Sequence, residues 1–573
     1  MGNEFVFDDI PYIRESPPVK DISKIGQSTL YTLNKASLTR SITVLSFAFN
    51  HYLHGFDVFG FHLFNLIIHL INGILIWLFV YLSLNLPKLS AYKNYQKELP
   101  FFAALLFITH PVQTQAVSYL AQRFASLATL FYLFSFVIYI YFRSKKSFNL
   151  IAQTALISTC FISAVLGALS KEIVFTLPVM LLIYEFYFLD GKEALNKIKS
   201  KAWIITPALL CFIAIPFILF EPSFVLKPRV SHAGEIHTFN KYFITQFSCL
   251  ITYLRLLILP IYQNLDYDFK LSQSFFSMRS FIGFWVLSGL FYTAYKCFKK
   301  HRLISFGVLW FLITISIESS IIPLKNLFFE HRLYLPLLGF ILFSLGLAYK
   351  FIPARHTKNI KYALMIIIVL FSAASYNRNK VWKNELTLWS DVANKSPNKA
   401  RPHHNLGIAI YHQNKFKEAI NEFSKAIKIN AHVRTFNSVG DSYLMRGNAY
   451  QHLKDYDKAL SDYSNVIKID PTQIFVYNNR GNILSNLGKH QEALKDYDTA
   501  IKMAPNYTEA IFNRGALLFN LKKTGLALKD LQRAKKLNPK DPQINQLYQI
   551  IMQSIIGKTT KMKNDKNPIT TVN

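Results

Sequence analysis

The main pattern along the chain is a run of apolar stretches that stops near residue 376. A helix that spans a bilayer needs about 20 mainly apolar residues. The pattern therefore predicts about ten membrane-spanning helices, some of which abut so closely that their limits are soft. We place them at residues 62–84, 101–117, 118–142, 150–169, 173–189, 203–221, 281–298, 303–323, 333–351 and 360–376.

Lys and Arg are concentrated in five of the connections between these stretches. Loops rich in Lys and Arg stay on the cytoplasmic side of a membrane protein. These five loops should therefore be cytoplasmic, which leaves the start of the chain and everything after residue 376 outside. They are residues 85–100, 143–149, 190–202, 296–302 and 350–361.

Residues 243–261 form a further apolar stretch, which contains Arg255 and Pro260. A full span here would place Lys299, Lys300 and Arg302 outside, against the charge rule. Irregular backbone at membrane depth is tolerated where protein or water covers it. We therefore expect a re-entrant or interfacial segment.

Beyond residue 400 the apolar stretches give way to a 34-residue period. This period is typical of the tetratricopeptide repeat, a pair of antiparallel helices. An earlier unit around Gly407 precedes Gly447 by 40 residues, which predicts an insertion near Thr435 to Gly440. The residues that recur are Gly447, Gly481 and Gly515; Ala459, Ala493 and Ala527; and Pro471, Pro505 and Pro539.

The expected fold is therefore all-α, with two physically different parts. Residues 1–61 form a non-cytoplasmic first loop with an interfacial helix, and residues 62–376 form the polytopic membrane domain. A linker at 377–399 leads to four repeats with a capping helix at 400–557, and a disordered tail follows at 558–573. Since no signal peptide precedes the first loop, we expect either export of a short acidic tail or a missing upstream helix.

The composition agrees with a membrane part and a soluble part, and it bears on whether the partner is a membrane or a nucleic acid. Of the 573 residues, 51% are hydrophobic and only 17% charged, which excludes intrinsic disorder. The net charge of +31 comes from basic residues spread through the loops. Membrane orientation explains that charge, so we expect a membrane partner and no nucleic acid.

Asp8 and Asp9 are adjacent acids in the predicted outside loop. A carboxylate there could take the proton of an acceptor hydroxyl, or hold a divalent ion beside a phosphate. The alternative is that both acids are solvated surface residues. Four histidines nearby, His51, His54, His62 and His69, show no metal-ligand spacing with carboxylates, so packing or interface roles are expected for them.

Several charged or polar side chains fall inside or beside apolar stretches, where they are costly unless they face water or a partner. They are His110, Arg123, Lys171, Glu172, Arg255 and Glu318. Each is a candidate site residue for that reason. For Lys171 and Glu172, mutual neutralisation is the alternative.

Glu330 to Pro336 brings an acid, two basic side chains and a phenol to the start of one apolar stretch. The planar guanidinium of Arg332 suits a lipid phosphate. Glu330 and Tyr334 would line the same place. The alternative is an arginine anchor that contacts lipid headgroups.

The repeats are expected to build a short superhelix whose concave groove binds an extended peptide. First helices of repeats supply the inner face of such a groove. The candidates for reading a peptide backbone are Asn405, Tyr443, Asn478, Asn479, Arg480, Asn513 and Arg514. The alternative is that these side chains are solvated or hydrogen-bonded within the repeats.

Taken in order, these motifs resemble the transmembrane and tetratricopeptide repeat-containing family over nearly the whole chain. The motifs are Phe7-Asp8-Asp9, Gly60-Phe61-His62, His110-Pro111, Lys171-Glu172, Leu259-Pro260 and Glu330 to Pro336, followed by the repeats. That family is similar to C-type glycosyltransferases that move mannose from a polyprenyl-phosphate lipid to protein hydroxyls on the lumenal side. The chain departs from the family's pattern at Gln115 and after Arg123, where Phe124 and Ala125 follow in place of an acid.

The resemblance implies roles for the candidates. Asp8 or Asp9 would activate the acceptor hydroxyl, and Arg332, helped by Lys171 or Arg123, would neutralise the departing phosphate. The remaining donor-site candidates are His110, Glu172, Glu330 and Tyr334. No redox cofactor is expected, and a divalent cation stays open.

Two other classes compete with an enzyme. A membrane-anchored scaffold would use the repeats alone, but an anchor needs one span and gains nothing from charges at 123, 171, 172 and 332. A transporter would show repeat symmetry between halves of the membrane region, and none is visible.

Overall fold

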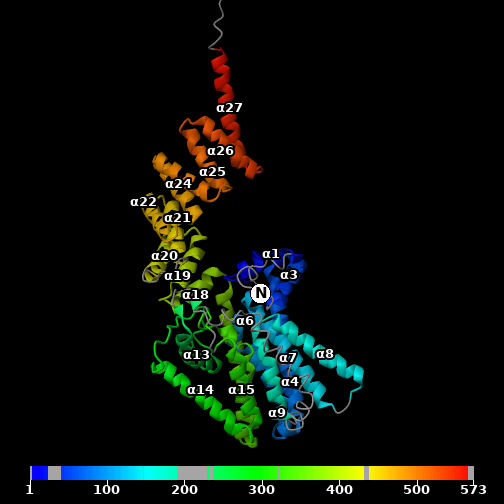
Figure 1. Cartoon of the computed structure of the whole chain (residues 1–573). Helices are drawn as coiled ribbons and strands as arrows, with labels where there is room; N and C mark the ends of the chain where they lie inside the picture. The colour runs from blue at the N-terminus through cyan, green and yellow to red at the C-terminus, as the bar shows by residue number, and fades with distance from the viewer. Residues whose placement is uncertain are drawn as a thin grey trace, which may run out of the picture. The chain divides into compact units, whose positions relative to one another are not determined.

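The computed structural model describes residues 3–23, 40–145, 148–189, 229–230, 236–319, 323–324, 326–430 and 438–564. The chain divides into two compact units, residues 1–397 and 398–573. Helices make up nearly all the regular structure of both (Figure 1). Two short strands, β1 (Arg229–Val230) and β2 (Ile236–His237), pair antiparallel. The expected all-α class is confirmed.

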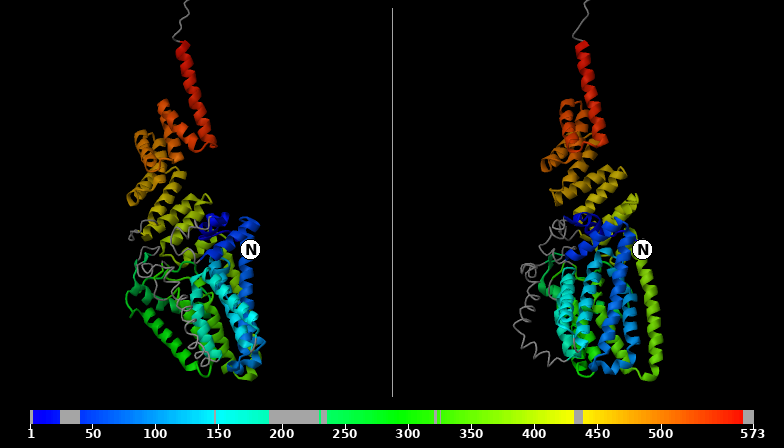
Figure 2. Two further views of the ribbon diagram at one scale, coloured as in Figure 1. Left: turned by 45° about the vertical axis from the view of Figure 1, so that its right-hand side comes forward. Right: turned by 90° about the vertical axis from the view of Figure 1, so that its right-hand side faces the viewer.

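The first unit is a bundle whose long helices run side by side (Figure 2). Its α-helices are α1 (Pro17–Lys20), α3 (Ser41–His54), α4 (Val58–Leu84), α5 (Glu98–Thr109), α6 (Thr114–Val117), α7 (Arg123–Ser144), α8 (Leu150–Ala168), α9 (Leu177–Phe188), α13 (Phe239–Ile258), α14 (Met278–Cys297), α15 (Arg302–Ser316), α16 (Pro336–Phe351), α17 (Thr357–Asn379) and α18 (Glu385–Lys395). Its short helical turns are η1 (Ile10–Arg14), η4 (Pro87–Tyr95), η5 (Pro111–Gln113), η6 (Leu120–Gln122), η7 (Glu172–Thr176), η8 (Glu330–Leu333), η9 (Ala354–His356) and η10 (Lys380–Trp382).

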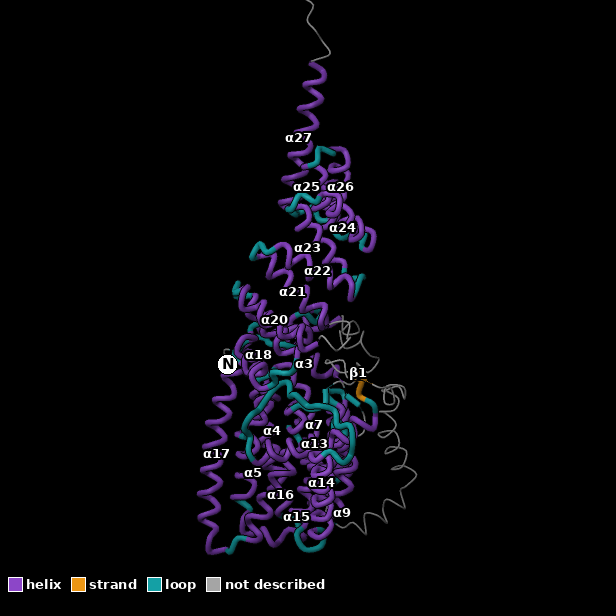
Figure 3. The backbone as a smooth tube through the Cα atoms, turned by 90° about the vertical axis from the view of Figure 1, so that its left-hand side faces the viewer, coloured by secondary structure: helices purple, strands orange, loops and turns teal. Residues whose placement is uncertain are grey.

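Four helices among the described residues are long and apolar enough to cross a membrane: α4, α7 with η6, α8, and α17 with η10. The apolar helices α5, α15 and α16 are shorter. Helix α17 lies at the edge of the unit (Figure 3) and exposes Tyr362, Ile366, Val369 and Leu370, as a lipid-facing helix would. The predicted span at 203–221 and the loop at 190–202 lie outside the described residues, so the number of spans remains a prediction.

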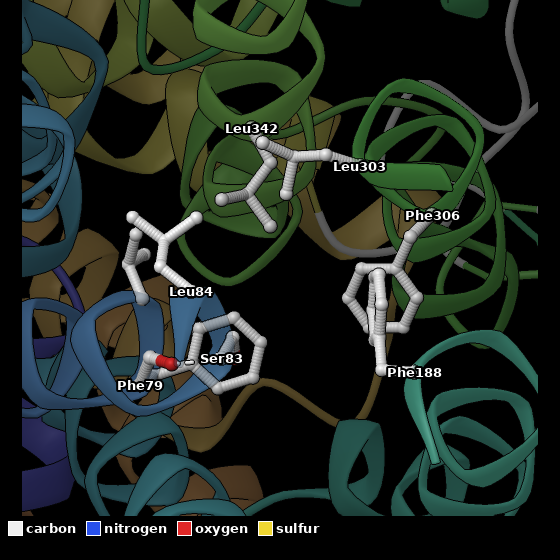
Figure 4. Close-up of a pocket in the computed structure, with 8 residues that line it drawn as sticks. Phe79, Ser83, Leu84, Phe188, Leu303, Phe306 and Leu342 are labelled. Carbon is white, nitrogen blue, oxygen red and sulfur yellow. Dashed lines mark hydrogen bonds between the residues drawn. The ribbon is translucent and has the colours of Figure 1, made fainter. Parts of the chain in front are cut away.

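Aromatic side chains from four helices form the centre of the bundle. Phe79 of α4 lies 5.4 Å from Phe136 of α7 and 5.5 Å from Trp310 of α15, measured between ring centroids. Tyr184 of α9 packs 5.4 Å from Phe136. Beside this cluster is a small apolar cavity (Figure 4), lined by Phe79, Val80, Ser83, Leu84, Phe188, Leu303, Phe306 and Leu342. No charged side chain lines this cavity, so it lacks the groups that a catalytic site needs.

The described parts of the basic loops meet at one end of the bundle. Lys361 pairs with Glu98 at 2.6 Å, which joins the starts of α17 and α5. The rings of Tyr95 and Tyr349 lie 4.6 Å apart, and Arg302 donates to the carbonyl of Tyr187 at 2.5 Å. We call this the basic end.

The opposite end is formed by the N-terminal segment, η5, η6, η7, η8 and α18. The side chain of His110 reaches the carbonyl of Leu257 at 3.1 Å, so the end of α13 lies here too. Residues 385–395 of the stretch predicted as a linker form α18, which begins with a capping box between Asn384 and Thr387. Trp382 and Trp389 are both buried, which explains why this stretch is ordered within the first unit.

The second unit is a series of helix pairs. They are α19 (Ala400–Tyr411) with α20 (Phe416–Asn430), α21 (Ser438–His452) with α22 (Tyr456–Ile469), α23 (Ile474–Asn486) with α24 (His490–Met503), and α25 (Thr508–Asn520) with α26 (Thr524–Leu537), followed by α27 (Pro542–Asn564). Of the predicted insertion, residues 435–437 lie outside the described residues, and residues 438–440 begin α21.

The recurring glycine of these repeats marks a close helix contact. A Cβ atom on Gly481 would lie 2.8 Å from the ring of Tyr497 on the second helix of the same pair. The recurring alanines, such as Ala493, are fully buried between helices. The prolines, such as Pro505, follow the ends of the second helices. The three recurring positions therefore mark helix contacts and helix ends.

Candidate functional site

Asp9 lies buried at the end of the bundle opposite the basic loops. Its Oδ1 accepts the backbone N–H of Ala121 at 2.6 Å, and its Oδ2 accepts that of Val6 at 3.1 Å. Burial raises the pKa of this carboxyl well above its usual value, against the effect of the two hydrogen bonds. Asp9 therefore fixes the N-terminal segment to η6, and it offers nothing to a substrate.

Asp8 differs from its neighbour because it is partly exposed. Its backbone N–H donates to the hydroxyl of Tyr119 at 3.2 Å. The preceding residue, Phe7, has a φ of +49°. Of the two acids in the predicted pair, Asp8 is the one that a substrate can reach.

The segment that carries Asp8 continues into η1, where it meets a cationic side chain. Tyr12 of η1 packs edge-on against the ring of Phe124, with 6.2 Å between centroids. The guanidinium of Arg40 lies 5.0 Å from the centre of the same ring. Burial and the charge of Asp8 both raise the pKa of the Tyr12 phenol, while Arg40 lowers it. Asp8 and Arg40 thus act on the same side chain.

Arg40 belongs to a cluster of charges drawn from four parts of the first unit. Arg40 pairs with Glu172 of η7 at 3.5 Å. Lys171 pairs with Glu318 at 2.6 Å, and both side chains are largely buried. The alternative in which Lys171 and Glu172 neutralise each other is wrong, because each has a different partner. Glu318 Oε2 has no hydrogen-bond partner among the described residues.

His331 and Arg332 of η8 complete this cluster. Burial, together with the charges of Lys171, Arg332 and Arg40, lowers the pKa of the His331 imidazole well below its usual value. Its Nδ1 is buried and has no partner in the described part of the chain. We call Arg40, Lys171, Glu172, Glu318, His331 and Arg332 the charged cluster. It gathers cations and unpaired polar atoms at the end where Asp8 lies.

Arg332 is held more tightly than its predicted role suggests. Its guanidinium donates to the carbonyls of Leu327 at 3.1 Å and Asn326 at 2.9 Å. It is 4% exposed. It can act on a bound phosphate through its charge, but its donors already hold the loop before η8.

Arg123 lies apart from the charged cluster and is wholly buried. It donates to Asn65 and Asn50 at 2.6 Å each, and to the carbonyl of Phe61 at 3.1 Å. Its guanidinium also lies 4.4 Å from the centre of the Phe47 ring. With these donors committed to α3 and α4, Arg123 serves the packing of the bundle.

His110 and Tyr334 are also committed to the fold. His110 Nδ1 accepts the N–H of Val112 at 3.2 Å, while its Nε2 faces the carbonyl of Leu257. The Tyr334 hydroxyl lies 2.7 Å from His69 Nδ1 and accepts from Asn72 at 3.1 Å. The structure therefore does not bring these two side chains to the charged cluster as phosphate ligands.

Glu330 holds the loop that follows α13. Its carboxylate accepts the N–H of Asn264 at 2.7 Å, the amide of Gln263 at 3.0 Å and the hydroxyl of Tyr267 at 2.6 Å. Burial raises the pKa of this carboxyl. With three donors already bound, Glu330 is a structural acid.

Several of the repeat candidates already have hydrogen-bond partners among the repeats. Arg480 makes two hydrogen bonds of 2.8 Å to Asp496, and Arg514 bonds Asp530 in the same way. Asn513 donates to Asn478 at 2.9 Å. Arg446 and Asp462 form the same pair 34 residues earlier. For the arginines, the alternative of hydrogen bonds within a repeat therefore describes the structure. Asn405 and Tyr443 are partly exposed.

Within the described residues, no group of three or more His, Cys, Asp or Glu side chains converges as metal ligands would. His62 and His69 instead bond the carbonyls of Asn3 and Ile108, at 3.2 Å and 3.0 Å. Arg40 was missed by sequence reasoning. An arginine in a predicted outside loop, just before an interfacial helix, was the available signal.

Comparison with known sequences identifies tetratricopeptide repeats at residues 440–473, 474–507 and 508–541. A protein O-mannosyl-transferase of Caenorhabditis elegans is 25% identical over 75% of this chain and 60% of its own length. Protein O-mannosyl-transferase Tmtc3 of Drosophila melanogaster is 24% identical over 83% of this chain and 59% of its own length. Human protein O-mannosyl-transferase TMTC3 is 24% identical over 83% of this chain and 55% of its own length. The chain thus spans less than two thirds of these relatives.

Among solved structures, the second unit is similar to repeat proteins. The first repeat domain of Spaghetti (RPAP3), bound to an HSP90 peptide, is 28% identical over 20% of this chain and 93% of that one, with a TM-score of 0.20. The repeat protein YrrB is 20% identical over 32% of this chain and 87% of its own, with a TM-score of 0.26. Scores this low carry no argument about function. The sequence relatives and the repeats together confirm the resemblance to the transmembrane and tetratricopeptide repeat-containing family.

Proposed function

We propose that this chain is an integral membrane glycosyltransferase that moves a mannose-like sugar from a polyprenyl-phosphate lipid to a protein hydroxyl. The names of its curated relatives support the reaction class. The single observation that supports the chemistry is that the partly exposed Asp8 and Arg40 of the charged cluster both act electrostatically on Tyr12, whose ring packs against Phe124 together with the Arg40 guanidinium.

The reaction is a single displacement at the anomeric carbon. Asp8 takes the proton of the acceptor hydroxyl as its oxygen forms a bond to that carbon. The bond between the carbon and the phosphate oxygen breaks, and its electron pair leaves with the lipid phosphate. The negative charge on the phosphate then needs cations in a place with little water.

Arg40 and Lys171 are the cations best placed to receive that phosphate. Arg40 is the more accessible, with 33% of its side chain exposed. Lys171 is paired with Glu318, whose second oxygen is unpartnered. Because the Lys171 ammonium has three N–H donors, a phosphate oxygen would bind it beside Glu318 and leave the buried ion pair in place. Arg332 would stabilise the phosphate through its positive charge, without a direct hydrogen bond.

The membrane arrangement belongs to the same proposal. The chain is multi-pass, its basic end faces the cytoplasm, and Asp8, the charged cluster and the repeats face the opposite side. The repeats would present the acceptor protein. Because Arg480 and Arg514 are already paired within their repeats, partly exposed residues such as Asn405 and Tyr443 are better placed to contact a peptide.

Sugar transfer from a labelled polyprenyl-phosphate mannose tests the proposal. We expect the purified full chain in lipid nanodiscs to release the sugar, to water or to a Ser/Thr-rich peptide. Asp8→Asn should lower the rate by about 10²- to 10⁴-fold, the usual effect of losing a general base. Asp21→Asn is the matched control, since Asp21 is exposed on the same segment and its Oδ1 accepts the backbone N–H and the hydroxyl of Ser23.

Two outcomes would contradict the proposal. A wild-type chain that releases no sugar would favour a scaffold whose repeats alone carry function. Equal rates for Asp8→Asn and Asp21→Asn would show that transfer does not use Asp8. In either case the unpartnered atoms of the charged cluster would need another explanation.

A further inference from the structure

The segment that carries Asp8 is fastened to a helix almost 380 residues later in the chain. Glu385, the first residue of α18, accepts the backbone N–H of Phe7 at 2.5 Å through its Oε1. Its Oε2 accepts the indole N–H of Trp389 one turn later. The Phe7 ring packs edge-on against that indole, with 5.1 Å between centroids. One carboxylate therefore links the residue before Asp8 to α18.

The conformation held in this way is an unfavourable one. Phe7 has a φ of +49°, in the left-handed region. For a bulky residue this region is strained and persists only where the surroundings enforce it. Such strain is often found next to functional groups. It directly precedes Asp8, the partly exposed member of the acid pair.

Neighbouring contacts fix the segment on both sides of Phe7. The backbone N–H of Glu4 donates to the carbonyl of Lys383 at 2.9 Å. That of Asp8 donates to the Tyr119 hydroxyl at 3.2 Å. The Tyr119 ring in turn stacks on Trp382 at 5.3 Å. These contacts set the path of the segment, while Glu385 bonds the strained peptide unit itself.

We propose that Glu385 is a positioning residue, whose carboxylate holds Phe7 in the left-handed conformation and thereby aims the Asp8 side chain at the acceptor hydroxyl. This inference rests on the proposed transferase function. Glu385 touches neither sugar nor phosphate in this role. Its effect should therefore be on turnover and not on donor binding.

Glu385→Gln is the decisive variant. The amide keeps the shape of the side chain. One of the two carboxylate oxygens becomes an NH₂ group, which cannot accept the N–H of Phe7 or of the Trp389 indole that faces it. We expect kcat to fall about tenfold, as the loss of roughly one hydrogen bond in the productive geometry would give. The KM for polyprenyl-phosphate mannose should not change, because the charged cluster is untouched.

Glu4→Gln is the matched control. Glu4 is exposed on the same segment, and its charge acts on Glu385, while its backbone N–H donates to the carbonyl of Lys383, just before α18. Removing its charge should leave kcat and KM as in the wild type. A fall in kcat for both variants would mean that Glu385 acts through charge alone, which overturns the positioning role.

Phe7→Gly provides the rescue that a general loss of stability could not imitate. Glycine adopts a positive φ without strain. In the Phe7→Gly background, Glu385→Gln should therefore cost less than about twofold in kcat, against about tenfold alone. Equal costs in the two backgrounds would contradict the proposal.

Hydrogen exchange separates this inference from the proposed function. In the full chain, Glu385→Gln should speed exchange at the amides of residues 5–9, while Glu4→Gln should not. If the wild type transfers no sugar, the proposed function fails, and exchange still reports whether Glu385 holds the segment. If the wild type is active and neither exchange nor kcat responds to Glu385→Gln, the positioning role alone fails.

Discussion

Arg123 and Lys171 both place a cation within or beside apolar sequence, yet they have opposite surroundings. Arg123 donates to Asn65, Asn50 and the carbonyl of Phe61, all supplied by α3 and α4. Lys171 meets only Glu318 as its ion-pair partner among the described residues. The sequence shows that such charges need a partner. Only the fold shows whether the partner is structural or exchangeable.

Arg123→Lys tests the structural role of this arginine. Lysine keeps the charge, but its single ammonium cannot donate at once to Asn65, Asn50 and the Phe61 carbonyl as the planar guanidinium does. We expect the free energy of unfolding to fall by about 3 kcal/mol. The KM for the lipid donor should stay unchanged, because Arg123 is outside the charged cluster.

The thermal unfolding midpoint in detergent measures this effect. Arg279→Lys is the control, since Arg279 is exposed at the start of α14. A raised donor KM with normal thermal stability would return Arg123 to the phosphate site, as the sequence predicted.

At the scale of elements, close packing of α15 and α16 depends on two glycines that face each other. A Cβ atom on Gly307 would lie 2.7 Å from the Gly339 carbonyl oxygen, and one on Gly339 would lie 2.6 Å from that of Gly307. Small residues at such positions let membrane helices approach closely. This pair sets the spacing of the helices that lead to η8 and the charged cluster.

Gly307→Ala should therefore destabilise the bundle. The methyl group meets backbone atoms, which cannot turn aside, so we expect a loss of about 1–3 kcal/mol. Gly289→Ala on α14 is the control, because nothing lies within 4 Å of its added Cβ. Equal melting temperatures for the two variants would show that α15 and α16 can separate without cost.

Elements also differ in how well the sequence predicted them. The 34-residue period located the repeat helices, since glycine, alanine and proline each recur where a helix contact or helix end requires them. Helix α18 lies in the stretch that was expected to be a linker. Burial of Trp382 against Tyr119 and of Trp389 against Phe7 orders it, and no local pattern reveals those contacts.

At the scale of the whole molecule, the proposed orientation can be tested by chemical labelling. In a background without native cysteines, a cysteine at Asn538 or Glu15 should react with a membrane-impermeant thiol reagent from outside. A cysteine at Lys300, in a basic loop, should react only after permeabilisation. All three positions are exposed. Labelling of Lys300→Cys in intact cells, with Asn538→Cys protected, would reverse the orientation.

The sequence by itself determined the helical class, the run of apolar segments and the repeat period, because these depend on local composition and spacing. It also predicted candidate site residues, among them Asp8, Lys171 and Arg332. Tertiary structure decided which of two adjacent acids is reachable, because Asp9 turns into the bundle to bond Ala121 while Asp8 does not. It also placed Arg40 beside Glu172 and Glu385 beside Phe7, since these contacts join segments far apart in the chain.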